Sequence, residues 1–181
     1  MEFSNFLEQN RDVLIKEKSD HVFKQGDNHP YLYFIKSGIL KAYYLTAEGK
    51  EFVKSFLLPG DIIGSLSSMY DSKQCTFSLI CLEKCELFRV DLQQYARLSL
   101  ENKDIAKVVI ELLIKLVMKK ERREYEFLCL SPEERYNEIR KNSPVLLDKV
   151  TQNDIARYLG ITPVALSRIR GRLAQKTSNP K

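Results

Sequence analysis

Short runs of β-branched and aromatic residues alternate with turn-forming residues through the first half of the chain. Glycines at positions 26, 38, 49 and 60 recur every 11 or 12 residues, each beside another turn former. Turn signals at that spacing predict a sandwich or barrel rather than strands that alternate with helices. The expected strands are Tyr31–Lys36, Ile39–Thr46, Glu51–Leu58, Cys75–Cys81 and Glu86–Val90. The architecture we infer for residues 20–90 is therefore a jelly-roll-like barrel.

Two short helices are expected to flank these strands. Asp91 is the N-cap expected for the helix that follows them, because its carboxylate can accept hydrogen bonds from the first free backbone N–H groups. The helix that precedes them is amphipathic. The residues that share one of its faces are Phe3, Phe6, Leu7, Val13 and Leu14.

A long helix is expected from Asn102 to about Leu128, a length of roughly 40 Å at 1.5 Å per residue. Its apolar stripe advances by 4, 3 and 4 residues and is broad for a single seam. We expect this stripe to form the interface of a homodimer as well as a contact with the barrel. The alternative is that the whole stripe packs within one chain. The stripe consists of Ile105, Val109, Leu112 and Leu116.

Three capped helices are expected in the last third of the chain. Ser131-Pro132-Glu133-Glu134 supplies an N-cap, a proline at the first helical position and a capping glutamate. Thr151 and Asp154 begin a short second helix, and Gly160 supplies the left-handed residue that ends it. Thr162-Pro163 begins the third. Two capped helices joined by a four-residue turn with a glycine, the last with a basic outer face, are typical of a helix-turn-helix.

The spacing and the charge of this segment favour the same motif. Counting Gln152 as position one, apolar residues occupy positions 4, 8, 10, 15 and 18, with Ala156 at position 5 and Gly160 at position 9. The net charge of the chain is +5, but residues 149–181 hold seven basic residues and one acid, so they carry +6. A basic segment on a near-neutral body indicates a polyanion binder. The alternatives are two tightly joined core helices and a solvated basic tail.

The last helix of this motif is expected to lie in the major groove of double-stranded DNA, with its N-terminal residues at base edges. Arg168 is the candidate for a bidentate contact to guanine, and Val164 for a contact to a thymine methyl group. Thr162 and Ser167 are expected to contact phosphate or base. The residues expected to contact phosphates, which position the protein without specifying sequence, are Gln152, Arg170 and Arg172.

A barrel, a long helix and a helix-turn-helix, in that order, resemble the cyclic-AMP receptor protein and fumarate–nitrate regulator (Crp/Fnr) family of bacterial transcription factors. The most specific segments besides the helix-turn-helix are Tyr33-Phe34-Ile35-Lys36-Ser37-Gly38 and Leu58-Pro59-Gly60-Asp61-Ile62-Ile63-Gly64. The resemblance implies an α+β fold: a cyclic-nucleotide-binding-like jelly roll (residues 1–101), a dimerisation helix (102–130) and a helix-turn-helix domain (131–181). It also implies a homodimer that senses a small molecule in the barrel and binds promoter DNA.

The sequence departs from this family where its cyclic-nucleotide members hold their ligand. Those members carry Gly-Glu-Leu after the Pro-Gly-Asp turn, where the glutamate holds the ribose, and further on an arginine that neutralises the phosphate. The matching positions here are Gly64-Ser65-Leu66 and Cys75-Thr76, with Lys73 in an expected loop as the alternative cation. A partly buried phosphate without a cation is costly, so cyclic AMP is not the expected effector. Gly64, Ser65, Leu66, Cys75 and Thr76 are the candidate pocket for an unidentified small-molecule effector, if the barrel takes one.

Other ligands and function classes find less support. The iron–sulfur members of the family need a cysteine cluster near the N-terminus, and no cysteine precedes Cys75. A cupin-type barrel enzyme needs about three histidines and a carboxylate, and the only histidines are His21 and His29. We therefore expect no enzyme activity, no cofactor and no metal. A cyclic-nucleotide-dependent regulator and a protein-interaction barrel with a basic tail remain as alternatives.

The hydropathy of the chain and its first residues indicate where in the cell the protein is expected. The longest apolar run, Val108–Met118, contains Glu111 and Lys115, so no segment approaches the roughly 18 residues of a membrane span. The first residues show no signal-peptide pattern. We expect a cytoplasmic bacterial protein that does not associate with membranes and keeps its four cysteines reduced.

Overall fold

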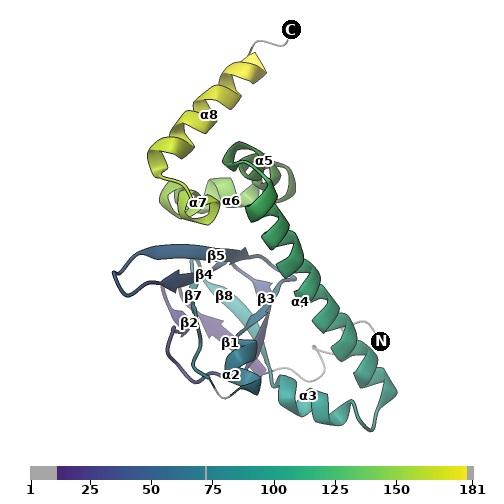
Figure 1. The fold of residues 1–181 in the computed structure, drawn as a ribbon. Coiled ribbons are helices and arrows are strands. Elements are labelled where there is room, and N and C mark those ends of the chain that lie inside the picture. Colours follow the sequence, from purple (N-terminus) through teal and green to yellow (C-terminus); the bar gives the residue numbers. More distant parts are fainter. Residues whose placement is uncertain (1–11, 72, 179–181) are drawn as a thin grey trace.

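The computed structural model describes residues 12–71 and 73–178, the last three of these by their backbone alone. Two four-stranded antiparallel sheets, with the orders β1-β8-β3-β6 and β2-β7-β4-β5, form a barrel (Figure 1). Side chains from both sheets fill its interior, among them Tyr33, Leu40, Leu79 and Leu87. The expected jelly-roll barrel is confirmed. Its strands are β1 (Asp12–Lys16), β2 (His21–Phe23), β3 (Leu32–Ser37), β4 (Leu40–Leu45), β5 (Glu51–Leu57), β6 (Ile62–Gly64), β7 (Ser78–Cys81) and β8 (Cys85–Val90).

Four of the five expected strands end within one residue of their predicted bounds, whereas β7 is shorter than Cys75–Cys81. The backbone of Cys75 is committed to a loop contact instead. Its N–H donates to the carbonyl of Asp27 and its carbonyl accepts from Gly26, both at 2.8 Å. Strands β1, β2 and β6 were not expected, because runs of three to five residues carry little periodicity.

The prediction of a helix before the barrel is wrong for Val13 and Leu14. Val13 and Leu14 lie in β1, where they pair with Phe88 and Leu87 of β8. In this edge strand Leu14 packs on the barrel core, whereas Val13, on the opposite face, is 44% exposed. Phe3, Phe6 and Leu7 lie outside the described residues.

The helices begin where their capping residues predict. The Asp91 carboxylate accepts a hydrogen bond from the Gln94 N–H (3.0 Å), and the Asn102 side chain accepts from the N–H groups of Asp104 and Ile105. Ser131 and Glu134 form the expected capping box. The short helices α2 and α6 were not expected, and neither has a side-chain cap. The helices are α2 (Leu66–Tyr70), α3 (Leu92–Leu98), α4 (Lys103–Cys129), α5 (Pro132–Asn142), α6 (Val145–Lys149), α7 (Gln152–Leu159) and α8 (Pro163–Ser178).

The apolar stripe of α4 that was expected to face a second copy packs on the chain's own barrel. Leu112 is 2% exposed, and Ile105, Val109 and Leu116 are half-buried, in a cluster that includes Phe88 of β8. The expected contact of this stripe with the barrel is confirmed, and Leu112 is fully used in it. Pairing of the half-buried Ile105, Val109 and Leu116 with a second protomer stays a prediction.

A different stripe of α4 is left without a partner in the described chain. Its members recur at helical spacing and are 38–63% exposed. An apolar stripe of this size on a polar helix is typical of an interaction surface. We call it the outer stripe of α4; it consists of Ile110, Leu113, Ile114, Val117 and Met118.

Helices α5, α6 and α7 lie over the β4–β5 side of the barrel, while α8 extends away from it (Figure 1). One cluster of buried residues joins Ile39, Val53 and Phe56 of the barrel region to the apolar core of these helices. Helix α7 packs directly on β5. None of the described helices is long and apolar enough to cross a membrane.

Candidate nucleic-acid interface and barrel pocket

The caps predicted for α7 are formed. The Thr151 hydroxyl accepts a hydrogen bond from the Asp154 N–H (3.1 Å) and donates to the Asp154 carboxylate (2.9 Å). Gly160 adopts the left-handed conformation with φ 69°, and the Ile161 N–H returns to the carbonyl of Ala156 (3.0 Å). This closed turn fixes the angle at which α8 leaves α7.

The inner face of the helix-turn-helix is a tight apolar core. Ala156 and Leu159 are fully buried, and Leu166 and Ile169 of α8 are no more than 5% exposed. Ala156 shares this core with Leu166 and Ile169, in agreement with the small side chain expected where the helices meet. Because these residues occupy one side of α8, the residues between them are directed outward.

The structure brings the candidate base-contacting residues of α8 to its outer face. Thr162, Val164, Ser167 and Arg168 are all exposed, Val164 at 61%. Arg168 forms no ion pair with any residue that the structure describes, so its guanidinium is available to a ligand. The Thr162 hydroxyl accepts a hydrogen bond from the Ala165 N–H (3.2 Å), which makes Thr162 the N-cap of α8.

The candidate phosphate contacts lie in different surroundings. Gln152 is exposed at the start of α7. Arg172 is exposed but already donates to the Glu133 carboxylate at 3.0 Å. Arg170 lines a small cavity of about 170 Å³ between α5 and α8, together with Arg140 and Tyr136. Arg140 was not expected there, because only the packing of α5 on α8 brings the two arginines together.

Charged residues also join the helix-turn-helix to the barrel. The Lys41 ammonium on β4 lies 2.9 Å from the Glu51 carboxylate on β5 and 3.0 Å from the Asp154 carboxylate on α7. Burial alone lowers the pKa of Lys41, but hydrogen bonds to these two carboxylates outweigh it and raise the pKa above its ordinary value. Lys41 and Asp154 are each less than 10% exposed. Two nearly buried, opposite charges thus hold α7 on the sheet.

Three further ion pairs involve residues of α6 and α7. Arg157 of α7 reaches the carboxylates of Glu51 (3.3 Å) and Asp154 (3.5 Å). Lys149 of α6 lies 2.8 Å from Glu83, in the turn between β7 and β8. The pairs with Glu51 and Glu83 were not expected, because their members are 106 and 66 positions apart in the sequence.

The five candidate effector-pocket residues differ in their exposure and surroundings. A Cβ on Gly64 would lie 2.5 Å from the Leu32 side chain, so this glycine is required by packing. Ser65 is buried beside the Ser67 hydroxyl (3.2 Å), and Cys75 is buried, whereas Leu66 and Thr76 are exposed. These five residues include no cation.

The alternative cation of this region is already paired. Lys73 lies 3.1 Å from the Asp71 carboxylate, and both side chains are exposed. An exposed lysine shared with an acid is a weak partner for a buried phosphate. Among the described residues, no group of three or more histidines, cysteines or carboxylates is arranged to hold a metal ion.

Comparison with known proteins agrees with this architecture. The Cyclic nucleotide-binding domain family matches residues 15–102. The chain is 30% identical to the Anaerobic regulatory protein of Aggregatibacter actinomycetemcomitans, over 94% of this chain and 69% of that protein. It is 26% identical to the Fumarate and nitrate reduction regulatory protein of Yersinia pestis, over 94% of this chain and 71% of that one.

Solved structures share the fold at lower identity. FixK2 from Bradyrhizobium japonicum superposes with a TM-score of 0.72 at 16% identity, covering 92% of this chain and 86% of its own. The regulator CLP of Xanthomonas campestris superposes with a TM-score of 0.71 at 20% identity, covering 96% and 91%. These structures share the fold, and the curated relatives define the class: a transcription regulator in which a cyclic-nucleotide-binding-type barrel precedes a helix-turn-helix. More particularly, the chain belongs to the Crp/Fnr family.

Proposed function

We propose that this regulator acts as a homodimer in the bacterial cytoplasm and binds promoter DNA sequence-specifically through α8. The observation that carries the proposal is the division of α8 into two faces. Leu166 and Ile169 are buried in the helix-turn-helix core, while Val164 and Arg168 are exposed to solvent. Arg168 forms no ion pair with any residue that the structure describes. A recognition helix needs such a face to enter the major groove.

Within the groove, Arg168 is proposed to donate two hydrogen bonds to guanine, and Val164 to contact a thymine methyl group. Ser167 lies beside them, and Thr162 stands at the N-terminus of α8, where phosphates are favoured. Gln152, Arg170 and Arg172 are proposed to contact phosphates. For Arg172 a phosphate contact competes with the ion pair to Glu133. We therefore propose that Arg172 contributes less to DNA affinity than an arginine without such a pair.

The outer stripe of α4 is proposed to form the dimer interface. Ile110, Ile114 and Val117 follow each other at intervals of four and three residues, which is the spacing of a helix seam. Parallel pairing of two α4 helices would carry the two recognition helices to successive major grooves, about 34 Å apart. The Ile105 to Leu116 stripe then holds α4 on its own barrel.

The effector of the barrel is proposed to be a molecule other than cyclic AMP, or none. Ser65 and Cys75 stand where the resemblance predicts the ribose-binding glutamate and the phosphate-binding arginine, and both are buried neutral groups. The match of residues 15–102 to the cyclic nucleotide-binding domain supports a cyclic nucleotide as the second candidate. Calorimetry with cyclic AMP and cyclic GMP separates the two, since micromolar binding would favour the second.

The test of DNA binding needs no known target site. Purified protein is mixed with a pool of random duplexes, and the bound fraction is sequenced after several rounds. The proposal predicts enrichment of an inverted repeat whose half-sites lie about 10 base pairs apart, centre to centre. Enrichment of no sequence, with binding to every duplex alike, would contradict sequence-specific recognition.

A further inference from the structure

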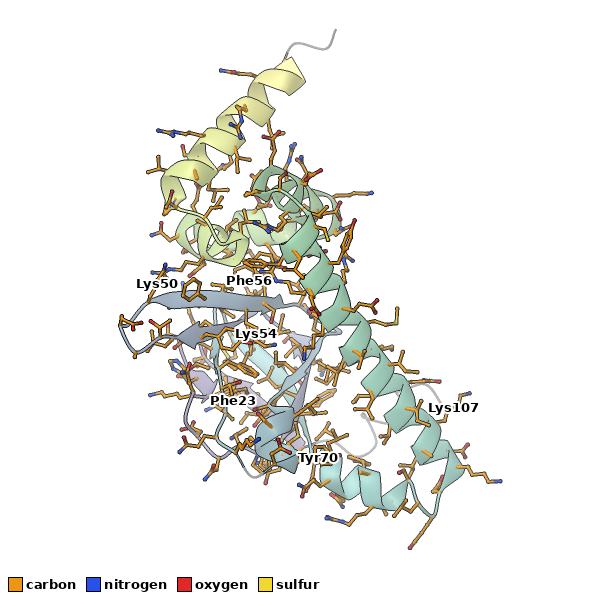
Figure 2. All side chains as sticks on the ribbon, viewed as in Figure 1. Phe23, Lys50, Lys54, Phe56, Tyr70 and Lys107 are labelled. Carbon is orange, nitrogen blue, oxygen red and sulfur yellow. The ribbon has the colours of Figure 1, made fainter. Side chains whose placement is uncertain are left out.

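A β-bulge in β5 places one aromatic ring beneath α7. The register between β4 and β5 shifts between Ala42 and Tyr43, so Lys54 is the extra residue of the bulged strand. Because a bulge interrupts the alternation of side chains, Val53 and Phe56 both pack with the apolar core of the C-terminal helices. Figure 2 shows Phe56 on the α7 side of β5 and Lys54 on the opposite side.

Tyr158, near the end of α7, contacts both the barrel and α4. Its ring lies 5.3 Å from the ring of Phe56, centre to centre. The guanidinium of Arg123, on α4, lies 3.9 Å from the centre of the Tyr158 ring, in a cation–π contact. Arg123 also donates a hydrogen bond from Nη2 to the Tyr158 carbonyl at 2.6 Å. One side chain of α4 therefore holds both the ring and the backbone of Tyr158.

Arg135 of α5 makes a second contact with the same end of α7. Its Nη2 donates to the Leu159 carbonyl at 3.0 Å, and its Nη1 donates to the Phe127 carbonyl of α4 at 2.8 Å. The last carbonyls of a helix have no partner within it and carry partial negative charge, so a guanidinium is well suited to them. Arg123 and Arg135 thus take the last two carbonyls of α7, those of Tyr158 and Leu159.

The Phe127 ring joins these contacts to the turn that leads into α8. The guanidiniums of Arg123 and Arg135 lie 5.6 and 4.9 Å from its centre. A Cβ on Gly160, the residue that ends α7, would lie 3.2 Å from the same ring. The end of α7, from which α8 departs, is therefore held against α4 and α5 at consecutive residues.

From this geometry we infer that Arg123 and Arg135 are positioning residues for DNA recognition, which fix the angle between α4 and the recognition helix α8. In a homodimer paired through α4, this angle sets the distance between the two recognition helices, and so the spacing of the half-sites that both can enter. The preferred ligand is then an inverted repeat of one spacing. The inference rests on the proposed homodimer and on DNA reading by α8.

The test measures binding of the full chain to three duplexes by fluorescence anisotropy. One duplex carries the selected inverted repeat, one carries the same half-sites separated by two additional base pairs, and one carries a single half-site. The unmodified protein should bind the selected repeat about tenfold or more tightly than the lengthened repeat, because avidity is lost where geometry forbids binding to both half-sites at once.

Arg123→Met keeps an aliphatic side chain but removes the hydrogen bond and the cation. It should reduce the discrimination between the two spacings about tenfold, while affinity for the single half-site changes by less than about twofold. A loss of stability alone would instead weaken binding to all three duplexes. Arg123→Lys and Arg135→Lys keep the charge but lose the planar fork, and should change the discrimination in the same direction.

Arg122→Met is the matched control. Arg122 is the neighbouring arginine of α4, but it is exposed and pairs with the carboxylates of Glu126 and Glu138 rather than with carbonyls of α7. This variant should keep the spacing discrimination of the unmodified protein.

Two outcomes would overturn the inference. One is an Arg123→Met variant that discriminates between the two spacings as the unmodified protein does. The other is an equal loss of affinity for all three duplexes, which would assign Arg123 to stability alone. A failure of the proposed function is distinguishable from both: the unmodified protein would bind selected and scrambled duplexes alike, and the inference would fall with it.

Discussion

The ammonium of Lys41, on β4, lies 3.0 Å from the carboxylate of Asp154, on α7, and so joins two residues that are 113 positions apart in the chain. Both are nearly buried, and Asp154 is also the residue whose N–H is capped by Thr151. The same carboxylate therefore takes part in starting α7 and in holding α7 on the barrel.

Lys41→Met should destabilise the protein by about 3 kcal/mol, because breaking a nearly buried pair leaves the Asp154 carboxylate without its closest counter-charge. Arg157 neutralises part of that charge. Urea unfolding measures the effect. The control is Lys36→Met, since Lys36 pairs with Glu86 on the surface and its loss should change the free energy of unfolding by less than about 1 kcal/mol. Equal changes in the free energy of unfolding would show that the Lys41–Asp154 pair contributes no more to stability than a surface ion pair.

The dimer prediction separates two neighbouring residues of α4. Ile114→Glu places a charge on the outer stripe and should give a folded monomer, because Ile114 is 51% exposed within the chain. Leu112→Glu buries a charge against the barrel and should instead reduce stability. Sedimentation velocity and thermal unfolding measure the two effects. A monomeric unmodified protein at micromolar concentration would contradict the proposed interface.

The two histidines predict a loss of stability in mild acid. Burial is the main cause that lowers the pKa of both His29 and His21 below 6.5. The unfolded chain therefore takes up protons first as pH falls through 6.5, so the stability from the neutral histidines is complete above that pH and declines below it. Urea unfolding at about pH 7.5 and pH 5.5 should show the decline.

The matched variants are His29→Gln, His21→Gln and the double substitution. His29 lies 2.6 Å from the Tyr33 hydroxyl and His21 lies 2.9 Å from the Tyr43 hydroxyl, so glutamine keeps a polar partner at each site. Each single variant should lose less stability on acidification than the unmodified protein, and the double variant least. A double variant with an unchanged pH dependence would contradict the assignment.

The parts of the fold that the sequence predicts correctly are those with local causes. Asn102, Ser131, Thr151 and Gly160 each act on backbone groups within a few residues, so their types and spacing suffice to place the helix ends. The buried positions of the helix-turn-helix follow from the same short-range periodicity. This is why the outer face of α8 could be predicted from the sequence.

The parts that escape prediction depend on non-local pairing. Both apolar stripes of α4 have helical spacing, and only the position of the barrel decides that the stripe containing Leu112 is the buried one. The side of β5 on which Lys54 lies depends on the register between β4 and β5 rather than on its own neighbours. The pairing of Lys41 with Asp154 likewise follows only from the packing of α7 on the sheet.

The most direct test of DNA reading is an equilibrium titration of a selected duplex and a scrambled duplex at two salt concentrations. Arg168→Ala should lose about 1–3 kcal/mol of binding free energy on the selected duplex and relax the preference at one base pair per half-site. Arg172→Ala should weaken binding to both duplexes alike and reduce the salt slope by about one per subunit. Equal losses on both duplexes for Arg168→Ala would make it a phosphate contact and contradict its role in specificity.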